Sequence, residues 1–222
     1  MIKACLFDLD GTVLDTINTI AFYCNKALEK FGIETIPTER FNYLAGKGAQ
    51  NLVESMLKER NCFSKELYEE IFPYYMGIYN EDPHYLTKPF DEIPSLLAFL
   101  KEKGIKAAVI SNKPDFATKN LCEKMFAKDS FEVVRGHVEG VKLKPNTEGA
   151  DLVMSELGVT KDEILYIGDT DIDMQTGKNL GAHTIGVLWG FRDEDELNAN
   201  GADELVSQPM EIAHIIERIN KK

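Results

Sequence analysis

The chain has 222 residues and a formal net charge of −12, from 25 Lys and Arg residues against 37 Asp and Glu residues. This length suits one large domain or a core with a smaller companion, and an apolar content of 44% is enough for a sizeable core. A surface this acidic repels nucleic-acid phosphates and anionic lipids, so we expect neither nucleic acid nor a membrane as a partner.

The chain opens with a buried strand, predicted over residues 2–9 because that run is short and apolar. Residues 16–85 carry helical patterns and no buried strand. Their clearest helix covers residues 17–31, where apolar residues recur at intervals of three and one before Gly32. Further helices are expected to open at Pro37, to cover residues 51–57 and to cover residues 64–79.

The second half of the chain alternates helical patterns with short apolar runs. We predict a helix over residues 93–100 and helix starts at Pro114 and Pro209. Strands are predicted over residues 107–110, 164–167 and 184–188.

This alternation indicates a parallel sheet between layers of helices, with right-handed crossovers. The predicted fold is α/β, a Rossmann-like three-layer core formed by residues 1–15 and 86–222. A helical cap subdomain, residues 16–85, is inserted after the first strand, and residues 82–90 return the chain to the core.

Four cysteines are present, and their wide spacing matches no paired zinc motif. We expect reduced thiols, which are typical of a cytoplasmic protein. The apolar runs are far shorter than the roughly 18 residues that a membrane span needs, and the N-terminus lacks a signal-peptide pattern. The sequence therefore predicts a cytoplasmic location. The cysteines are Cys5, Cys24, Cys62 and Cys122.

Candidate functional residues stand where the predicted strands end, which is where open parallel sheets bind ligands. Asp8 and Asp10 close the first strand ahead of Gly11. Side chains two apart on a strand point the same way, so both carboxylates can face one pocket. Two neighbouring carboxylates oppose each other's ionisation, which suits a nucleophile beside a general acid. An acidic turn is the alternative.

The second group, Ser111-Asn112-Lys113-Pro114, follows the strand predicted over residues 107–110. A hydroxyl, an amide and backbone N–H groups at a helix start form a phosphate cradle, although an ordinary N-cap fits the same residues. The third group is Lys144-Pro145. Lys144 can project its ammonium into the site, but Lys142 is close enough to compete for that role, and either lysine can be a surface residue.

The fourth group, Gly168-Asp169-Thr170-Asp171-Ile172-Asp173, closes the strand over residues 164–167. Its carboxylates can join Asp8 around a hard divalent cation such as Mg²⁺, which prefers oxygen ligands. A calcium loop is excluded because no glycine follows Asp173 directly and Leu180 occupies the position of the closing glutamate. A solvated turn stays open as an alternative.

The order and spacing of these four groups, with the insertion after the first strand, resemble the haloacid dehalogenase superfamily, specifically its capped phosphatases. The resemblance covers essentially the whole chain and extends to the phosphoglycolate phosphatase branch through residues 111–114 and Trp189-Gly190. The lysine motif departs from the family pattern, because Asn146-Thr147 follow where a second proline is common.

The resemblance implies phosphoryl transfer through an aspartyl-phosphate. Asp8 matches the nucleophile and Asp10 the general acid and base. The remaining matches are phosphate binding by Ser111, Asn112 and Lys144, and Mg²⁺ binding by Asp8, the backbone carbonyl of Asp10, Asp169 and Asp173.

The resemblance also implies that the cap determines substrate specificity. The loop Gly46-Lys47-Gly48 is the candidate for closing over the substrate. Lys47 can meet a substrate carboxylate or be a solvated lysine. We expect a small phosphorylated metabolite as substrate, with 2-phosphoglycolate first. Sugar phosphates, nucleotides and pyrophosphate are alternatives. The sequence does not determine the oligomeric state.

Three alternative functions fit the sequence less well. A sugar phosphomutase shares nearly all these residues, but Gly168 stands where such mutases tend to carry an acidic residue. A dehalogenase would lack Asp10. A non-catalytic binding module would be expected to have lost one of Asp8, Asp10, Lys144 or Asp169, and all four are present.

Overall fold

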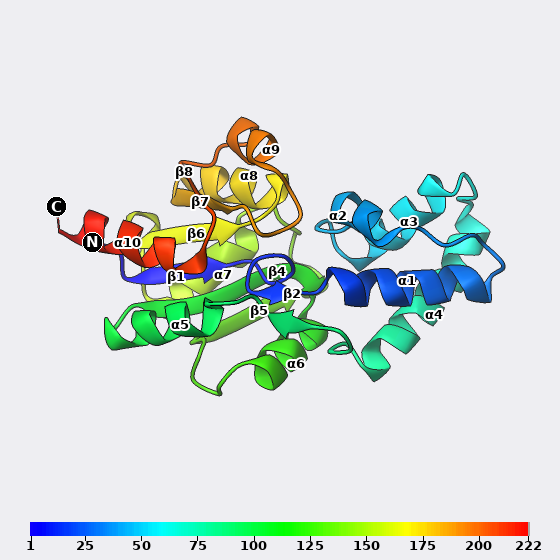
Figure 1. Ribbon diagram of the computed structural model, residues 1–222, viewed down its shortest axis with the longest axis horizontal. Coiled ribbons are helices and arrows are strands. Elements are labelled where there is room, and N and C mark those ends of the chain that lie inside the picture. Colours follow the sequence, from blue (N-terminus) through cyan, green and yellow to red (C-terminus); the bar gives the residue numbers. More distant parts are fainter. Residues whose placement is uncertain (222) are drawn as a thin grey trace.

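The computed structural model describes residues 1–221. Within this range a 6-stranded parallel sheet runs in the order β5-β4-β1-β6-β7-β8 (Figure 1). Its first strand, β1, lies in the middle, so both edges are formed by later parts of the chain. The strands are β1 (Ala4–Phe7), β4 (Lys106–Pro114), β5 (Val133–His137), β6 (Ile164–Gly168), β7 (His183–Val187) and β8 (Glu204–Val206).

Helices cover both faces of the sheet. Cys5 and Phe7 of β1 pack in one apolar cluster with α5, α6 and α10, and Ala4 and Leu6 pack in another with α7 and α8. This alternation follows from the period of two along a strand, and a central strand buried on both faces is apolar throughout. The helices of the core are α5 (Ile93–Glu102), α6 (Asp115–Met125), α7 (Glu148–Leu157), α8 (Asp171–Leu180), α9 (Glu194–Ala199) and α10 (Pro209–Asn220).

The helical cap lies beyond the end of the sheet at which β1 leads into β2 and α1 (Figure 1). It has an apolar cluster of its own, built mainly from α1, α3 and α4. A short antiparallel ribbon of β2 with β3 joins it to the core. The elements of this region are β2 (Leu14–Asp15), α1 (Ile17–Lys30), a 3₁₀ turn (Thr38–Arg40), α2 (Phe41–Leu44), α3 (Ala49–Glu59), α4 (Lys65–Glu81) and β3 (Lys88–Pro89).

The predicted fold class is confirmed, since a parallel three-layer core carries an inserted helical cap. Strands β5 and β8 were not predicted from the sequence. Both are edge strands in which buried residues alternate with half-buried ones, and β5 carries Arg135 and Gly136. The ribbon strand β3 falls in the segment predicted as a return linker. The predicted core range ends at residue 222, which lies outside the described residues.

Two further predictions concern the cysteines and membrane-spanning helices. All four cysteines carry free thiols, as predicted, but only Cys5, Cys24 and Cys122 are buried, whereas Cys62 is half-buried. Among residues 1–221 no helix has the length and apolar character that crossing a membrane requires.

Candidate active site

The four sequence groups meet at the carboxyl ends of β1, β4 and β6. Asp8 follows β1, and its backbone N–H donates to the carbonyl of Ile167 on β6 at 2.9 Å. Ser111 lies within β4, which continues to Pro114, so α6 begins only at Asp115. The expectation that Ser111 stands at a helix start is therefore corrected: its position is set by the sheet.

A buried cluster of three carboxylates forms the centre of the site. Asp8, Asp169 and Asp173 each offer an oxygen, and these oxygens lie within 4.8 Å of one another. The Lys144 ammonium lies 2.7 Å from Oδ1 of Asp8 and 2.7 Å from Oδ1 of Asp173, and it donates to the carbonyl of Ile110 at 3.1 Å. Three carboxylates thus face one ammonium.

This imbalance of charge shifts the pKa values of the site. Burial, with the charge of Asp173 added, raises the pKa of Asp8 to about 7 although Lys144 opposes the shift. Burial and Asp173 likewise raise the pKa of Asp169 well above its usual range. Burial lowers the pKa of Lys144, but Asp173 and Asp8 outweigh that effect and raise it. A divalent cation with oxygen ligands would balance the surplus negative charge, so the cluster fits one.

Hydrogen bonds hold the carboxylate of Asp169 in a fixed orientation. Asp169 accepts hydrogen bonds from Thr12 Oγ1 at 2.9 Å and from the Phe191 N–H at 2.8 Å. The Trp189 indole in turn donates to the Thr12 carbonyl at 3.0 Å. A Cβ at Gly11 would lie 2.1 Å from Oδ2 of Asp169, so only glycine fits there. Thr12 is the last residue of the first sequence motif but was given no role there, and Phe191 was not identified from the sequence.

Asp173 has a double role. As the third residue of α8 it accepts from the backbone N–H of Thr170 at 3.2 Å and from the Thr170 hydroxyl at 2.7 Å, which completes a capping box. Its other oxygen binds the Lys144 ammonium. The helix start therefore fixes the carboxylate that in turn holds the lysine.

Asp10 faces a second buried lysine. The Lys113 ammonium donates to Oδ1 of Asp10 at 2.9 Å and to Oδ2 at 3.0 Å, and it lies 5.0 Å from the centre of the Tyr79 ring. Burial lowers the pKa of Lys113, but Asp10 and Tyr79 raise it by a larger amount. The net shift of the pKa is upward, so the side chain is charged. From the sequence, Lys113 was quoted only as part of its motif and was not predicted to be a site residue.

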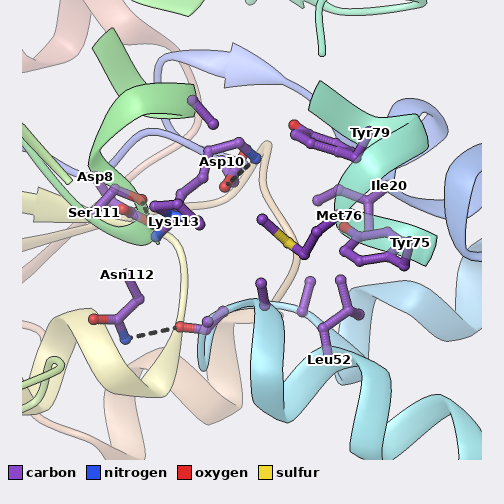
Figure 2. Close-up of a pocket in the computed structure, with 16 residues that line it drawn as sticks. Asp8, Asp10, Ile20, Leu52, Tyr75, Met76, Tyr79, Ser111, Asn112 and Lys113 are labelled. Atoms are coloured by element: carbon purple, nitrogen blue, oxygen red, sulfur yellow. Dashed lines mark hydrogen bonds and ion pairs between the residues drawn. The ribbon is translucent and has the colours of Figure 1, made fainter. Parts of the chain in front are cut away.

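A cavity of about 50 Å³ lies between the core and the cap (Figure 2). The core side supplies charged and polar groups. The cap side supplies apolar and aromatic ones, and the α3 and α4 helices contribute most of them. The lining residues labelled in Figure 2 are Asp8, Asp10, Ser111, Asn112 and Lys113 from the core, and Ile20, Leu52, Tyr75, Met76 and Tyr79 from the cap.

Asn112 connects three segments. Its Nδ2 donates to the carbonyls of Gly46 and Lys144, each at 3.1 Å, and its Oδ1 accepts from the Lys144 N–H at 2.8 Å. The contact with Gly46 is drawn in Figure 2. The amide expected to bind phosphate is thus occupied in holding the cap loop and the Lys144 loop together.

The remaining candidates divide between the cavity and the surface. Gly46 and Gly48 line the cavity and adopt positive φ angles of 105° and 85°. Lys47, between them, is exposed and does not line it. Lys142 is exposed as well, whereas Lys144 is buried against Asp8, so the geometry favours Lys144 of the two competing lysines.

Comparison with known proteins gives a consistent result. The family model for haloacid dehalogenase-like hydrolases matches residues 5–187. The phosphoglycolate phosphatase of Aquifex aeolicus is 32% identical, with 97% of each chain covered. A Clostridium perfringens protein assigned as the pyrophosphatase PpaX is 30% identical, covering 99% of this chain and 100% of its own.

Solved structures agree. A crystal structure from Lactobacillus delbrueckii, assigned as a phosphoglycolate phosphatase, superimposes with a TM-score of 0.91 at 30% identity, covering 96% of this chain and 98% of its own. The family match, the identity over nearly full length and the buried carboxylate cluster point the same way. The chain therefore belongs to the haloacid dehalogenase-like hydrolase family and is a phosphatase.

Proposed function

We propose that this phosphatase hydrolyses 2-phosphoglycolate, with Mg²⁺ as cofactor, through an aspartyl-phosphate on Asp8. The observation that carries this proposal is the pairing of Asp8 with the buried Lys144, at one end of a small cavity that Asp10 also lines. In this proposal residues 1–15 and 86–222 are the catalytic core, and residues 16–85 are the cap that covers it.

The proposed reaction has two steps. A carboxylate oxygen of Asp8 attacks phosphorus while the bond from phosphorus to the ester oxygen breaks, and Asp10 gives its proton to the departing alkoxide. Asp10 then takes a proton from water, which attacks the phosphorus of the aspartyl-phosphate. Inorganic phosphate leaves, and Asp8 returns to its starting state.

Charge compensation makes the first step possible, because a carboxylate must approach a phosphate dianion. Lys144, already 2.7 Å from Asp8, would neutralise part of that charge, and Ser111 would bind a phosphoryl oxygen. Asp8, Asp169, Asp173 and the backbone carbonyl of Asp10 would hold Mg²⁺ directly or through water. The ion supplies further positive charge to the phosphoryl oxygens when bound.

The choice of substrate rests on the cavity and on the relatives. A cavity of about 50 Å³ suits a leaving group of a few atoms better than a hexose or a nucleoside. The similar Aquifex aeolicus protein is a phosphoglycolate phosphatase. Pyrophosphate is the second candidate, since its leaving group is equally compact and the similar Clostridium perfringens protein is assigned as a pyrophosphatase. The free thiols support a cytoplasmic location.

Phosphate release from a panel of compounds tests the proposal. Wild-type enzyme is assayed with 2-phosphoglycolate, pyrophosphate, glucose 1-phosphate and AMP, in Mg²⁺ and in EDTA, beside the Asp8→Asn variant. We expect the highest kcat/KM with 2-phosphoglycolate, loss of activity in EDTA, and no turnover by Asp8→Asn. A higher kcat/KM for another compound would overturn the substrate, and wild-type turnover by Asp8→Asn would overturn the mechanism.

A further inference from the structure

We propose that Lys113 and Tyr79 form a subsite for a carboxylate on the leaving group, so that these two residues select a short phosphorylated 2-hydroxy acid. The inference rests on the proposed function, because it concerns the half of the same cavity that faces away from phosphorus. It assigns a role in substrate choice to a core lysine and a cap tyrosine that the reaction steps above do not use.

Lys113 is placed to bind an anion inside the cavity. It is 8% exposed, and among residues 1–221 it is the one lysine or arginine that lines this cavity. An ammonium has three N–H donors. Two of the donors serve the oxygens of Asp10, at 2.9 and 3.0 Å, and the third is shared between the neighbouring Tyr79 hydroxyl and any ligand oxygen placed beside it.

Tyr79 supplies the second polar group. Its side chain comes from α4 of the cap, and its hydroxyl is buried beside the Lys113 ammonium with no acceptor for its own proton among the described residues. Figure 2 shows the hydroxyl directed toward the Lys113 ammonium, which lies 5.0 Å from the ring centre. A buried hydroxyl whose proton lacks an acceptor is unfavourable, and a ligand oxygen in contact with both the hydroxyl and the ammonium would accept that proton.

The spacing of these groups matches a 2-hydroxy acid. In 2-phosphoglycolate three bonds separate the ester oxygen from a carboxylate oxygen, a distance of about 3 Å. The oxygens of Asp10, which would protonate the ester oxygen, lie 2.9 and 3.0 Å from the Lys113 ammonium. A leaving group whose ester oxygen contacts Asp10 therefore brings its carboxylate within reach of Lys113.

The other cavity walls limit the rest of the leaving group. Ile20, Leu52 and Met76 close the cap side with apolar atoms. The hydroxyls of a hexose would be buried against these atoms without partners, whereas glycolate has no polar group beyond its carboxylate.

The test compares 2-phosphoglycolate with its primary amide, which has the same shape and no carboxylate charge. The measured quantity is the ratio of kcat/KM for the acid to kcat/KM for the amide within each variant. This ratio cancels any change in the folded fraction or in the action of Asp10 common to both substrates. We expect a ratio of at least about 10 in the wild type, a ratio near one in Lys113→Met, and an intermediate ratio in Tyr79→Phe.

Two further lysines serve as comparisons. Lys128→Met changes an exposed lysine that does not line the cavity, and the wild-type ratio should persist. Lys47→Met tests the rival cap lysine, and it should also keep the ratio. A ratio near one in Lys47→Met would show that Lys47 binds the carboxylate of the substrate, and it would overturn the proposed subsite.

The outcomes separate the subsite from the function on which it rests. A wild-type enzyme inactive on 2-phosphoglycolate overturns the proposed function itself. Activity with equal rates on acid and amide, or a wild-type ratio retained in Lys113→Met, overturns the subsite alone. Should Lys113→Met not fold, Tyr79→Phe decides, because it removes a single oxygen and a ratio equal to that of the wild type contradicts the proposal.

Discussion

The two sides of the cavity differ in how their residues are held. On the core side Asp169 and Asp173 each accept two or more hydrogen bonds, from groups that include backbone N–H donors. On the cap side Leu52 and Met76 present apolar surface that no directional bond orients. The charged groups that the reaction needs are thus fixed at the ends of strands. The wall of the cavity that meets the leaving group consists of apolar side chains, and substituting them should disturb the charged groups little.

The core side would lose most from a change at Asp10. Asp10→Asn keeps the shape but cannot donate and recover a proton, so we expect kcat with 2-phosphoglycolate to fall about 10³-fold. Para-nitrophenyl phosphate has a leaving group that needs little protonation, and its rate of Asp8 phosphorylation should fall much less. Burst kinetics with both compounds measures the difference. An equal loss with both would show that Asp10 is not the general acid.

Lys144 tests how far the core depends on charge balance. Lys144→Met leaves three buried carboxylates without their ammonium, and breaking such a pairing costs about 3 kcal/mol in the free energy of unfolding. The loss should be larger near pH 8, above the pKa of about 7 for Asp8, than near pH 5, where Asp8 is protonated. Urea unfolding without Mg²⁺ measures it. Lys142→Met, which changes an exposed lysine, is the matched control, and an equal effect there would contradict the assignment.

Most of the core side could be predicted from the sequence, because carboxylates that directly follow buried parallel strands lie together at the carboxyl edge of the sheet. Asp8, Asp169 and Asp173 were located for that reason and lie together in the structure. Lys113 and Thr12 stand in the sequence motifs, but their roles were not predicted because their contacts with Asp10 and Asp169 depend on side-chain direction, which spacing along the chain does not encode. The edge strands β5 and β8 were missed because half-exposed strands lack a continuous apolar run.

The pH dependence of stability provides a further test of the core side. The pKa of Asp8 is about 7 in the folded protein, above its ordinary value of 3.8. Between these values the folded protein holds a proton that the unfolded chain has released, so the free energy of unfolding falls as pH rises through this interval. Mg²⁺ competes with those protons, so its stabilising effect should grow with pH.

Thermal unfolding with and without Mg²⁺ checks this expectation. The increase in Tm on adding Mg²⁺ should be larger at about pH 8 than at about pH 5. Asp169→Asn removes one carboxylate of the cluster and should reduce the increase at the higher pH. An increase in Tm that is the same at both pH values would contradict the coupling between protons and the cation.

The cap side should respond weakly in stability and visibly in selectivity. Met76 lines the cavity from α4, and Met76→Ala enlarges the space for the leaving group. We expect kcat/KM for glucose 1-phosphate relative to 2-phosphoglycolate to rise about 10-fold, the size of effect that one or two carbon atoms produce in an apolar pocket. Met154→Ala is the matched control, because Met154 lies on α7 against the core cluster and the change removes the same atoms away from the cavity. A rise of equal size in both variants would mean that overall loosening, and not the cap wall, sets the preference, and the division between a core that reacts and a cap that selects would then be wrong.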